Sequence, residues 1–568
     1  MYILGISGYV LHSSAALIKD GVLLANVQEE RYTRKKHDAS FPVNSIQYCL
    51  DYAGITIDDI DYIGFHMKPW LHFNKRLWQI VKNLPKSLAF WGTHQSAWSG
   101  MRNCENDLKR AFRIRKPHYK FSFIEHHMAH AASCFYVSPF SSAAILTLDG
   151  CGEMATTLLA SAKDRKITKL DEIFYPHSLG YLWGSFTHYL GFIPDNDEYK
   201  VMGLSAYGKP EYYDELSKIV HLKPDASFEI DMSYFNYQKG IKNPWVSEKF
   251  IEKFGPIRKK DEEVTDKHAN LAKSLQVLTE DIAIAMARKL KDKTGERYLC
   301  LSGGTAQNSV MNGRLLHEGL YDDVYVQPAS YDGGISIGVA YYLYHQILNQ
   351  PKMGFIQRHA YLGDEFSKED ILKAIETSNL LYEEYADETI TKKVAKLLDK
   401  GKIVAWFQGR METGPRALGN RSILADARRE EMKDVVNKKV KKRESFRPFA
   451  PSVLHEFGSE YFENYTYNPF MTMVFPVKED KKKEIPAVTH VDGTARLQSV
   501  DRETNPRYWD LINHFRQITG CPVILNTSFN VMGEPIIRTP SEAINCFCNV
   551  DIDYLVLGNF LLFKKQDE

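Results

Sequence analysis

The sequence predicts an α/β protein whose first half contains a duplicated core. Two segments share one pattern, in which an apolar strand runs into a glycine-containing loop and is followed by a β-hairpin. The expected strands are residues 2–7, 14–18 and 22–27 in the first copy, and residues 143–148, 155–162 and 167–173 in the second. A helical segment near residues 42–54 separates the copies, and such repetition favours a core built by duplication.

The chain after the second copy predicts a long helix and two strand-to-glycine turns. Apolar residues recur at spacings of three and four over residues 265–293, which is typical of one buried helix face. Strands at 298–301 and 324–326 then lead into Ser302-Gly303-Gly304 and Asp332-Gly333-Gly334. In open α/β sheets such turns lie at the carboxyl edge, where helix N-termini attract phosphate, so we expect a nucleotide cleft there.

Length and composition indicate a globular protein of several domains. The chain has 568 residues, which at about 150 residues per domain favours two to four domains. Its 44% hydrophobic and 25% charged residues are ordinary for such folds. Pro351, Gly354 and Gly363 interrupt the pattern, so we expect a first domain at 1–350 and a second α/β domain at 355–568.

The charge balance argues against nucleic acid and against a membrane as partner. Basic residues number 72 and acidic residues 71, so any phosphate chemistry must come from local clusters. The eight cysteines form no C-x-x-C motif, as suits reduced thiols in the cytosol. We find no signal peptide and no apolar run of the roughly 18 residues that a membrane span needs, so we expect a cytoplasmic protein.

Two histidines and two aspartates form a candidate metal site. His126 and His130 lie four residues apart on an expected helix, so their imidazoles can converge on one ion. A polar helix face explains two histidines equally well. Asp149, at the end of a buried strand, and Asp332, in the second glycine turn, raise the weight of the metal interpretation. Such ligands suit Fe(II), Mn(II) or Zn(II), and the spacing does not name the metal.

Two further N-terminal segments have both a functional and an ordinary explanation. His12 follows the first strand, where a histidine is most often structural but can act as a general base at the mouth of a cleft. The run from Glu29 to Lys36 is mostly charged and would normally be a solvated surface.

The second half contains the strongest cationic pattern. Arginine and lysine alternate with glycine, proline and aromatic residues in two stretches, 414–422 and 441–451, unlike a freely solvated helix. Guanidinium groups bind phosphate oxygens in pairs. Arg496 and the stretch 525–530 add further donors. Because the net charge is near zero, a small phosphorylated ligand is favoured over nucleic acid.

Together these segments resemble the NodU/CmcH O-carbamoyltransferase family. The matching stretches follow the family's order almost from end to end: His12-Ser-Ser-Ala-Ala, Glu29–Lys36, His126–His130, Leu148-Asp149-Gly150, Lys200-Val-Met-Gly203, Ser302-Gly-Gly304 with Asn308, Gly414–Ser422, Arg447–Pro451 and Asn526–Asn530. Several of them are long and irregular, so the resemblance is more specific than any short motif.

The resemblance implies a fold and two reactions. The first domain would be an actin-like, RNase H-like duplicated (TsaD/Kae-like) domain, and the second a YrdC-like α/β domain. The second would make carbamoyl adenylate from carbamoyl phosphate and ATP, and the first would pass the carbamoyl group to a hydroxyl of a natural product or sugar. An alcohol is a poor nucleophile at neutral pH, so the transfer needs a base and a polarised carbonyl.

The family's functional residues carry over by motif. His12 would be the base, Lys36 would lie near the acceptor or the carbonyl, and a divalent metal, Fe(II) first with Mg²⁺ or Mn²⁺ open, would be bound by His126, His130, Asp149 and Asp332. A nucleotide in the first domain would lie at Gly303, Gly304 and Asn308. Carbamoyl phosphate and ATP would lie at Arg416, Lys441, Arg447, Arg496, Asn526 and Ser528.

Other functions stay open at this point. A tRNA threonylcarbamoylation enzyme would combine the same domain types, although the charge balance argues against tRNA binding. A non-catalytic ATP-binding scaffold of the actin-like class is the alternative that is not an enzyme. We expect a small-molecule hydroxyl acceptor, and a homodimer stays open. The identity of the acceptor is outside what the sequence determines.

Overall fold

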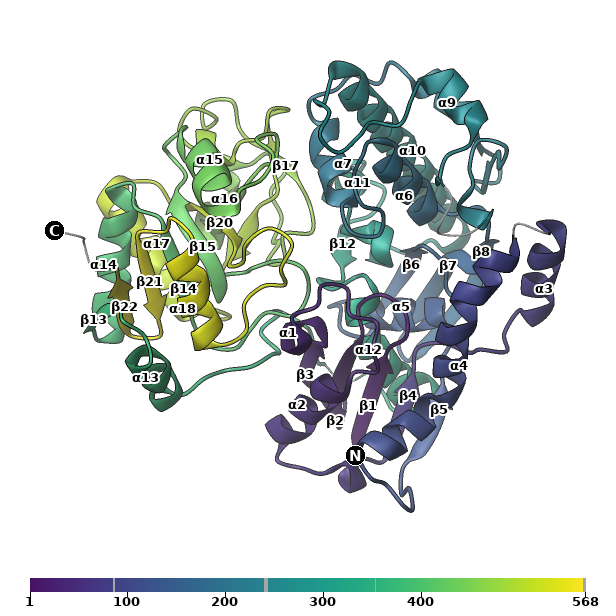
Figure 1. Ribbon diagram of the computed structural model, residues 1–568, viewed down its shortest axis with the longest axis horizontal. Helices are drawn as coiled ribbons and strands as arrows, with labels where there is room; N and C mark the ends of the chain where they lie inside the picture. The colour runs from purple at the N-terminus through teal and green to yellow at the C-terminus, as the bar shows by residue number, and fades with distance from the viewer. Residues whose placement is uncertain (85–86, 240–243, 353, 565–568) are drawn as a thin grey trace. The chain divides into compact units, whose positions relative to one another are not determined.

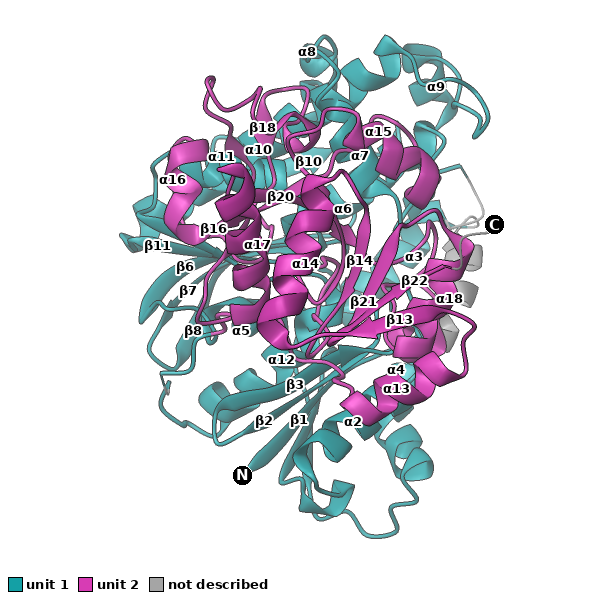
Figure 2. Ribbon diagram, turned by 90° about the vertical axis from the view of Figure 1, so that its left-hand side faces the viewer, with its two compact units in different colours: residues 1–29, 37–356 teal, residues 30–36, 357–568 magenta. Residues whose placement is uncertain are grey.

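The computed structural model describes all residues except 85–86, 240–243, 353 and 565–568, and the side chains of 87–96 are likewise outside the description. The chain divides into two compact units. The first contains residues 1–29 and 37–356, and the second contains residues 30–36 and 357–568 (Figure 2). The short segment 30–36 thus packs with the second unit, although it lies early in the chain.

The first unit contains two five-stranded sheets with the same strand order. The first sheet has the order β3-β2-β1-β4-β5, and the second, read from the corresponding edge, has the order β8-β7-β6-β11-β12. In each, an antiparallel meander continues into two parallel strands on the other side. The strands are β1 (Tyr2–Ser7), β2 (Ser14–Lys19), β3 (Val22–Gln28), β4 (Tyr62–Phe65), β5 (Lys120–Phe123), β6 (Ser142–Leu148), β7 (Ala155–Lys163), β8 (Lys166–Phe174), β11 (Tyr298–Ser302) and β12 (Asp323–Val326). This confirms the duplicated core predicted from the sequence.

Two helices pack between these sheets. Helix α12 (Asp332–Tyr341) covers the first sheet and α5 (His126–Phe135) covers the second, and the two helices pack against each other (Figure 1). Their approach depends on glycine, because a Cβ atom on Gly338 would lie 1.8 Å from the carbonyl oxygen of Ala129. The close packing brings the N-termini of the two helices together.

The remaining elements of the first unit surround this core. The long helix predicted at 265–293 is confirmed as α10 (Asp266–Thr294). A small ribbon is formed by β9 (Val220–Leu222) and β10 (Phe228–Ile230). The other helices are α2 (Val43–Ala53), α3 (Phe73–Lys82), α4 (Ser87–Ala111), α6 (Leu179–Tyr189), α7 (Glu198–Ser205), α8 (Tyr213–Ser217), α9 (Glu248–Phe254) and α11 (Ser309–His317).

The second unit is built on one mixed sheet of eight strands in the order β13-β22-β21-β14-β15-β20-β16-β19. The strands are β13 (Leu381–Glu384), β14 (Val404–Phe407), β15 (Arg421–Asp426), β16 (Ala450–Leu454), β19 (Gln498–Val500), β20 (Val523–Ser528), β21 (Tyr554–Leu557) and β22 (Phe560–Phe563), with a separate ribbon of β17 (Phe475–Pro476) and β18 (Thr494–Ala495). The helices are α1 (Glu30–Thr33), α13 (Lys368–Glu376), α14 (Asp387–Asp399), α15 (Met432–Val435), α16 (Gly458–Tyr461), α17 (Pro506–Thr519) and α18 (Pro540–Asn549). The predicted α/β class therefore holds for both units.

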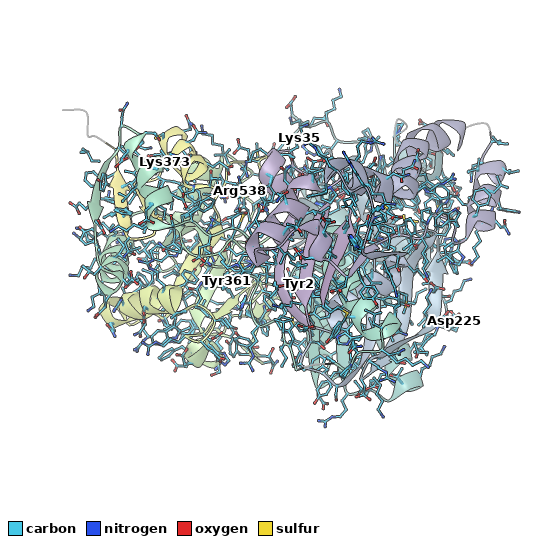
Figure 3. The ribbon with its side chains drawn as sticks, turned by 90° about the horizontal axis from the view of Figure 1, so that it is seen from below. Tyr2, Lys35, Asp225, Tyr361, Lys373 and Arg538 are labelled. Atoms are coloured by element: carbon cyan, nitrogen blue, oxygen red, sulfur yellow. The ribbon has the colours of Figure 1, made fainter. Side chains whose placement is uncertain are left out.

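Polar contacts join the segment 30–36 to the rest of the second unit. Tyr32 donates a hydrogen bond to Asp364 at 2.9 Å. Arg538 binds the same carboxylate at 3.0 Å, and its guanidinium lies 4.5 Å from the centre of the Tyr32 ring. Figure 3 labels Arg538 among the side chains. Arg34 donates to the carbonyl oxygens of Pro535 and Ile536. Within the described residues, none of the helices is both long and apolar enough to cross a membrane.

Candidate functional site

Four side chains in the first unit form what we call the His–Asp cluster: His126, His130, Asp149 and Asp332. Their ligand atoms all lie within 4.8 Å of one another. Nε2 of His126 is 3.0 Å from Asp149 and 3.6 Å from Asp332, and Nε2 of His130 is 3.8 and 3.5 Å from the same two carboxylates. The two histidines and two aspartates that the sequence singled out therefore converge on one point.

Local structure explains why they converge. His126 is the first residue of α5, and His130 follows one turn later on the same face. Asp332 is the first residue of α12, and Asp149 comes directly after β6. Gly152 is needed beside them, because a Cβ atom there would lie 2.8 Å from Cβ of His126.

Surrounding hydrogen bonds orient the cluster. Nδ1 of His130 lies 3.2 Å from the Ser302 hydroxyl, and the backbone N–H of Gly304 donates to Asp149 at 2.7 Å. In contrast, Nε2 of His130 and Oδ1 of Asp332 are buried without a hydrogen-bond partner. Buried polar atoms of this kind normally have a partner, so the donor set fits a cation between them.

Electrostatics support the same conclusion. Burial lowers the pKa of His126, but the hydrogen bond to Asp149 and the charges of Asp332 and Asp149 outweigh burial and raise that pKa to about 9. Burial raises the pKa values of both aspartates, and the imidazoles outweigh it and hold them below their usual range. Two buried carboxylates therefore favour added positive charge. Two nitrogen and two oxygen donors suit a divalent transition metal.

His12 lies close to this cluster. Its ring is 4.5 Å from that of Tyr331, the residue immediately before Asp332. Nδ1 of His37 lies 3.1 Å from Nε2 of His12, and Nε2 of His37 lies 2.6 Å from the amide oxygen of Asn196. Because an amide oxygen accepts, His37 donates to Asn196 through Nε2, and its Nδ1 can accept a hydrogen from His12.

The sequence analysis did not identify His37 and Asn196. The adjacency of His37 to the matched stretch 29–36 was the one signal available for the first, and nothing in the sequence connects it with a residue 159 positions away. Lys36 is half-buried and belongs to the segment that packs with the second unit.

The residues predicted to bind a nucleotide in the first unit are already used by the fold. Gly303 has φ +95°, and a Cβ atom there would lie 2.2 Å from the Leu148 carbonyl oxygen. The N–H of Gly304 is bonded to Asp149, as described above. The Asn308 side chain caps α11 through the N–H of Met311. Any nucleotide there would have to be held largely by other backbone groups.

In the second unit, four arginines form what we call the arginine cluster: Arg416, Arg443, Arg447 and Arg496. Burial, together with the charges of the other three, holds the pKa of Arg496 well below its usual range. Nε of Arg496 is buried without a hydrogen-bond partner. Glu444 is 3.7 Å from Arg447. Guanidinium groups that crowd together in this way call for an anion. Arg443 lies in the cationic stretch 441–451 but was not among the residues predicted to bind carbamoyl phosphate and ATP.

Lys441 and Ser528 come together, as expected for one site. The buried Nζ of Lys441 donates to the carbonyl oxygens of Ser528 and Asn530, and lies 3.3 Å from the Ser528 hydroxyl. Burial, with the charges of Arg443 and Arg447, holds the pKa of Lys441 well below its usual range. Asn526, two residues earlier on β20, donates instead to Ser452 and Gln498 at 3.1 Å each.

One carboxylate organises the loop that bears Arg416. Oε1 of Glu412 accepts hydrogen bonds from the backbone N–H groups of Leu418, Asn420 and Arg421, at 2.8, 2.8 and 3.1 Å. Three amides on one buried oxygen fix the loop backbone and so the position from which Arg416 extends. No sequence pattern indicated this role for Glu412.

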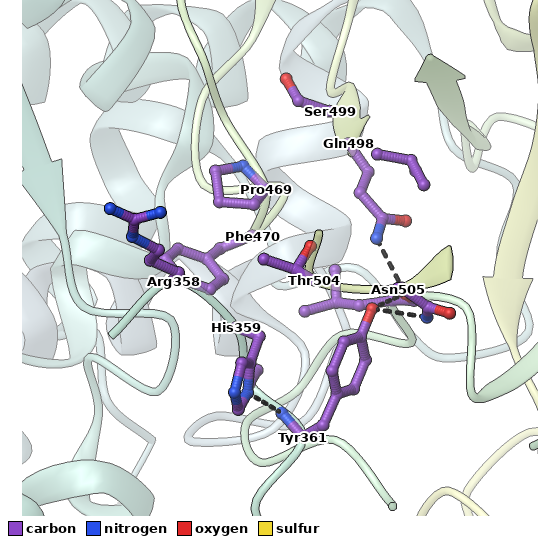
Figure 4. A pocket seen from close by; sticks show the side chains of 12 residues that line it. Arg358, His359, Tyr361, Pro469, Phe470, Gln498, Ser499, Thr504 and Asn505 are labelled. Carbon is purple, nitrogen blue, oxygen red and sulfur yellow. Dashed lines mark hydrogen bonds between the residues drawn. The ribbon is translucent and has the colours of Figure 1, made fainter. Parts of the chain in front are cut away.

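A small pocket of the second unit lies behind the same loop. Tyr361 donates to the carbonyl oxygen of Leu418 at 2.8 Å, and Asn505 donates to the Tyr361 hydroxyl at 2.9 Å (Figure 4). The cation that lines it, Arg358, lies 3.2 Å from Glu503. The pocket therefore supports the loop rather than providing a second phosphate site.

Comparison with known proteins gives matches over most of the chain. Two family models match, described as the carbamoyltransferase N-terminus at residues 2–341 and the carbamoyltransferase C-terminus at residues 395–564. The protein sll1178 of Synechocystis sp. is 44% identical, with 99% of this chain and 97% of that protein covered. Nodulation protein NolNO of Sinorhizobium fredii is 37% identical, with 98% and 79% covered. Nodulation protein NolO of Bradyrhizobium diazoefficiens is 39% identical, with 78% and 79% covered.

Solved structures match more weakly. A crystal structure of component A of the (R)-2-hydroxyglutaryl-CoA dehydratase of Acidaminococcus fermentans has a TM-score of 0.32 and 13% identity, with 60% of this chain and 97% of that chain covered. A crystal structure of HypF from T. kodakarensis has a TM-score of 0.31 and 15% identity, with 61% and 48% covered. Scores this low carry no conclusion about function.

Proposed function

This chain belongs to the carbamoyltransferase family, and we propose that it forms carbamoyl adenylate in its second unit and transfers the carbamoyl group to an alcohol in its first. The observation that carries the proposal is the presence of two clusters, one in each unit, that favour ligands of opposite charge. In the arginine cluster, burial and three neighbouring guanidinium groups lower the pKa of Arg496, which favours binding of an anion, and the donor atoms of the His–Asp cluster fit a cation. We propose carbamoyl phosphate and ATP as substrates, and a hydroxyl of a small natural product or sugar as acceptor.

In the second unit, phosphate groups are bound by Arg416, Arg447 and Arg496. Water cleaves carbamoyl phosphate to carbamate and inorganic phosphate, and a carbamate oxygen then attacks the α-phosphorus of ATP as pyrophosphate leaves. Positive charge around the site stabilises the charge that develops on the phosphates. Lys441 keeps the 528–530 backbone in place, and the mixed eight-stranded sheet that carries these residues is the basis on which we propose a YrdC-like domain.

In the first unit, His12 removes the proton from the acceptor hydroxyl as that oxygen attacks the carbamoyl carbon and AMP leaves. Its hydrogen-bonding partner His37, held by Asn196, orients the ring for that step. A divalent metal, which we propose is Fe(II), would be bound by His126, His130, Asp149 and Asp332 and would act as a Lewis acid. We also propose that Lys36 assists at the acceptor or the carbonyl.

Two further parts of the proposal concern binding and location. Backbone groups around Gly303, Gly304 and Asn308 are proposed to contact the nucleotide, with the Asn308 side chain acting as helix cap rather than ligand. We propose that the reaction takes place in the cytoplasm, without a nucleic-acid partner. The eight free cysteines of the protein are compatible with a reducing compartment.

The division of labour can be tested by measuring pyrophosphate released from carbamoyl phosphate and ATP. Arg447→Ala should lower the rate by about 100-fold or more, because it removes a phosphate-binding cation. His12→Ala should leave this rate unchanged and abolish carbamoylation in a panel of hydroxylated acceptors followed by mass spectrometry. The matched control is Lys442→Ala, an exposed neighbour that should behave as the unmodified protein. An equal loss of pyrophosphate release in the Arg447 and His12 variants would rule out two separate sites.

A further inference from the structure

Helix α3 (Phe73–Lys82) is attached to the first unit by its polar side. Arg76 donates to the carbonyl oxygen of Glu153 at 2.7 Å, and Gln79 donates to the carbonyl oxygen of Tyr175 at 3.4 Å. None of the ten residues of the helix is buried. An amphipathic helix of a globular protein normally packs its apolar side inward, so this orientation is reversed.

The apolar side of the same helix faces solvent. Phe73, Leu77 and Val81 follow one another at intervals of four residues, which places them on one stripe. Leu77 and Val81 are 47% and 58% exposed. Together with neighbouring exposed residues they form what we call the α3 stripe: Trp70, Phe73, Leu77, Trp78, Val81 and Leu84. Contiguous exposed apolar side chains of this size mark interaction surfaces (Figure 1 shows α3 beside β8 and α4).

The chain around the stripe is strongly basic. Residues 68–104 contain no aspartate or glutamate and six basic residues: Lys68, Lys75, Arg76, Lys82, Lys86 and Arg102. The expectation of no membrane partner rested on the net charge of the whole chain, which is +1 and conceals this local excess. The stripe is therefore apolar, and the chain segment that contains it is basic.

We propose that the α3 stripe binds the surface of a bilayer that contains anionic lipid. Exposed tryptophan, leucine and valine beside lysine is the composition of helices that lie in the headgroup region, with the apolar side chains at the acyl boundary and the lysines near lipid phosphates. Lys82 is exposed, lies 5.0 Å from the centre of the Trp78 ring in the stripe and can occupy that position, whereas the ammonium of Lys75 lies 3.2 Å from the centre of the Phe174 ring in β8. No segment crosses the bilayer in this arrangement.

A second copy of the chain is a poorer occupant. Two α3 stripes face to face would bring Lys75 and Lys82 of both copies together, and the helix has no carboxylate with which to pair them. Anionic lipid supplies the missing negative charge. The proposal does not depend on the proposed function, since it concerns only where the protein docks.

The test is sedimentation of the full chain with vesicles of phosphatidylcholine, with or without about 30% phosphatidylglycerol. We expect binding to the anionic vesicles and at least about tenfold less to the neutral ones, because several lysines contribute. The double variant Leu77→Glu, Val81→Glu should lose binding by at least about tenfold. Lys82→Gln should weaken it by about fivefold.

The matched control is Val491→Glu, which changes a valine that is 59% exposed in the second unit, against 58% for Val81. It should bind vesicles as the unmodified protein does. Thermal unfolding checks that each variant is folded, and surface changes of this kind should leave the midpoint nearly unchanged. Absence of binding to anionic vesicles overturns the proposal. So does a concentration-dependent dimer, seen by sedimentation velocity, that the Leu77→Glu, Val81→Glu change abolishes while vesicle binding is unaffected.

Discussion

The His–Asp cluster and the arginine cluster differ in how their charges are arranged. In the first unit, buried carboxylates and imidazoles lie within 4.8 Å and partly neutralise one another. In the second, arginines crowd around Arg496, whose pKa is held low by burial and by its neighbours. A charge left without its opposite is costly inside a protein, so each site indicates the charge of its ligand. One chain therefore brings together two clusters of different charge, one of imidazoles with carboxylates and one of guanidinium groups, and these favour ligands of opposite charge.

The largest expected effect is on metal binding by the His–Asp cluster. Asp149→Asn keeps the shape of the side chain and an oxygen that can still accept the Gly304 N–H, but removes one negative charge. We expect divalent-metal affinity to fall by about 100-fold or more, measured by anaerobic calorimetry with Fe(II) and Mn(II). Asp171→Asn is the control, because Asp171 is in the same unit and pairs with Lys289 instead. Unchanged metal binding in Asp149→Asn would contradict a metal role for the cluster.

The next largest effect is on protein stability and phosphate binding at the arginine cluster. Arg496→Met removes a guanidinium that is surrounded by like charge, so we expect the ligand-free protein to become more stable by about 1 kcal/mol. Stabilisation by added inorganic phosphate should at the same time be largely lost, since that stabilisation depends on binding to the folded state. Urea unfolding with and without phosphate measures both quantities.

Arg429 is the control for Arg496, because it is paired with a carboxylate instead of being surrounded by other arginines. Arg429 lies 3.3 Å from the buried Asp426, so Arg429→Met should lower the stability and leave the phosphate effect intact. If both variants change stability in the same direction, the arginine cluster is not under mutual repulsion.

The smallest effect is on the pH dependence of stability that Glu198 contributes in the first unit. Burial and the charge of Asp195 raise the pKa of Glu198 from 4.5 to about 8. The folded state therefore holds a proton that the unfolded state releases, and the stabilisation is present below about pH 4.5 and is lost as the pH rises through about 8. Glu198→Gln should reduce the fall in unfolding free energy between pH 5 and pH 8 by about 1–2 kcal/mol. Denaturant titrations at both pH values check this, and an unaltered pH slope would show that Glu198 is ionised in the fold.

Patterns within short segments were enough for much of this protein. The repeat of strand, loop and hairpin predicted the duplicated core, and spacing of three and four predicted α10 to within one residue at each end. The four residues of the His–Asp cluster were recognised because a helix places His126 and His130 on one face, and because Asp149 and Asp332 end a strand and begin a helix. Their action as ligands stays a prediction.

Contacts between segments far apart in the chain could not be predicted from the sequence. His37 and Asn196 are 159 residues apart, and Glu412 organises its loop through backbone amides that carry no residue signature. The reversed orientation of α3 also escaped, because periodicity shows that a helix has an apolar face but not which face the protein covers.

The sequence by itself determined the α/β class, the family and the residue types at both sites, because periodicity, turn residues and irregular motifs are local properties of the chain. Only the tertiary structure decided which groups meet. The close approach of Gly338 to Ala129 sets the N-termini of α5 and α12 side by side, and packing assigns Lys36 to the second unit but His37 to the first. Both depend on how side chains fill space between segments far apart in the chain, which no single segment encodes.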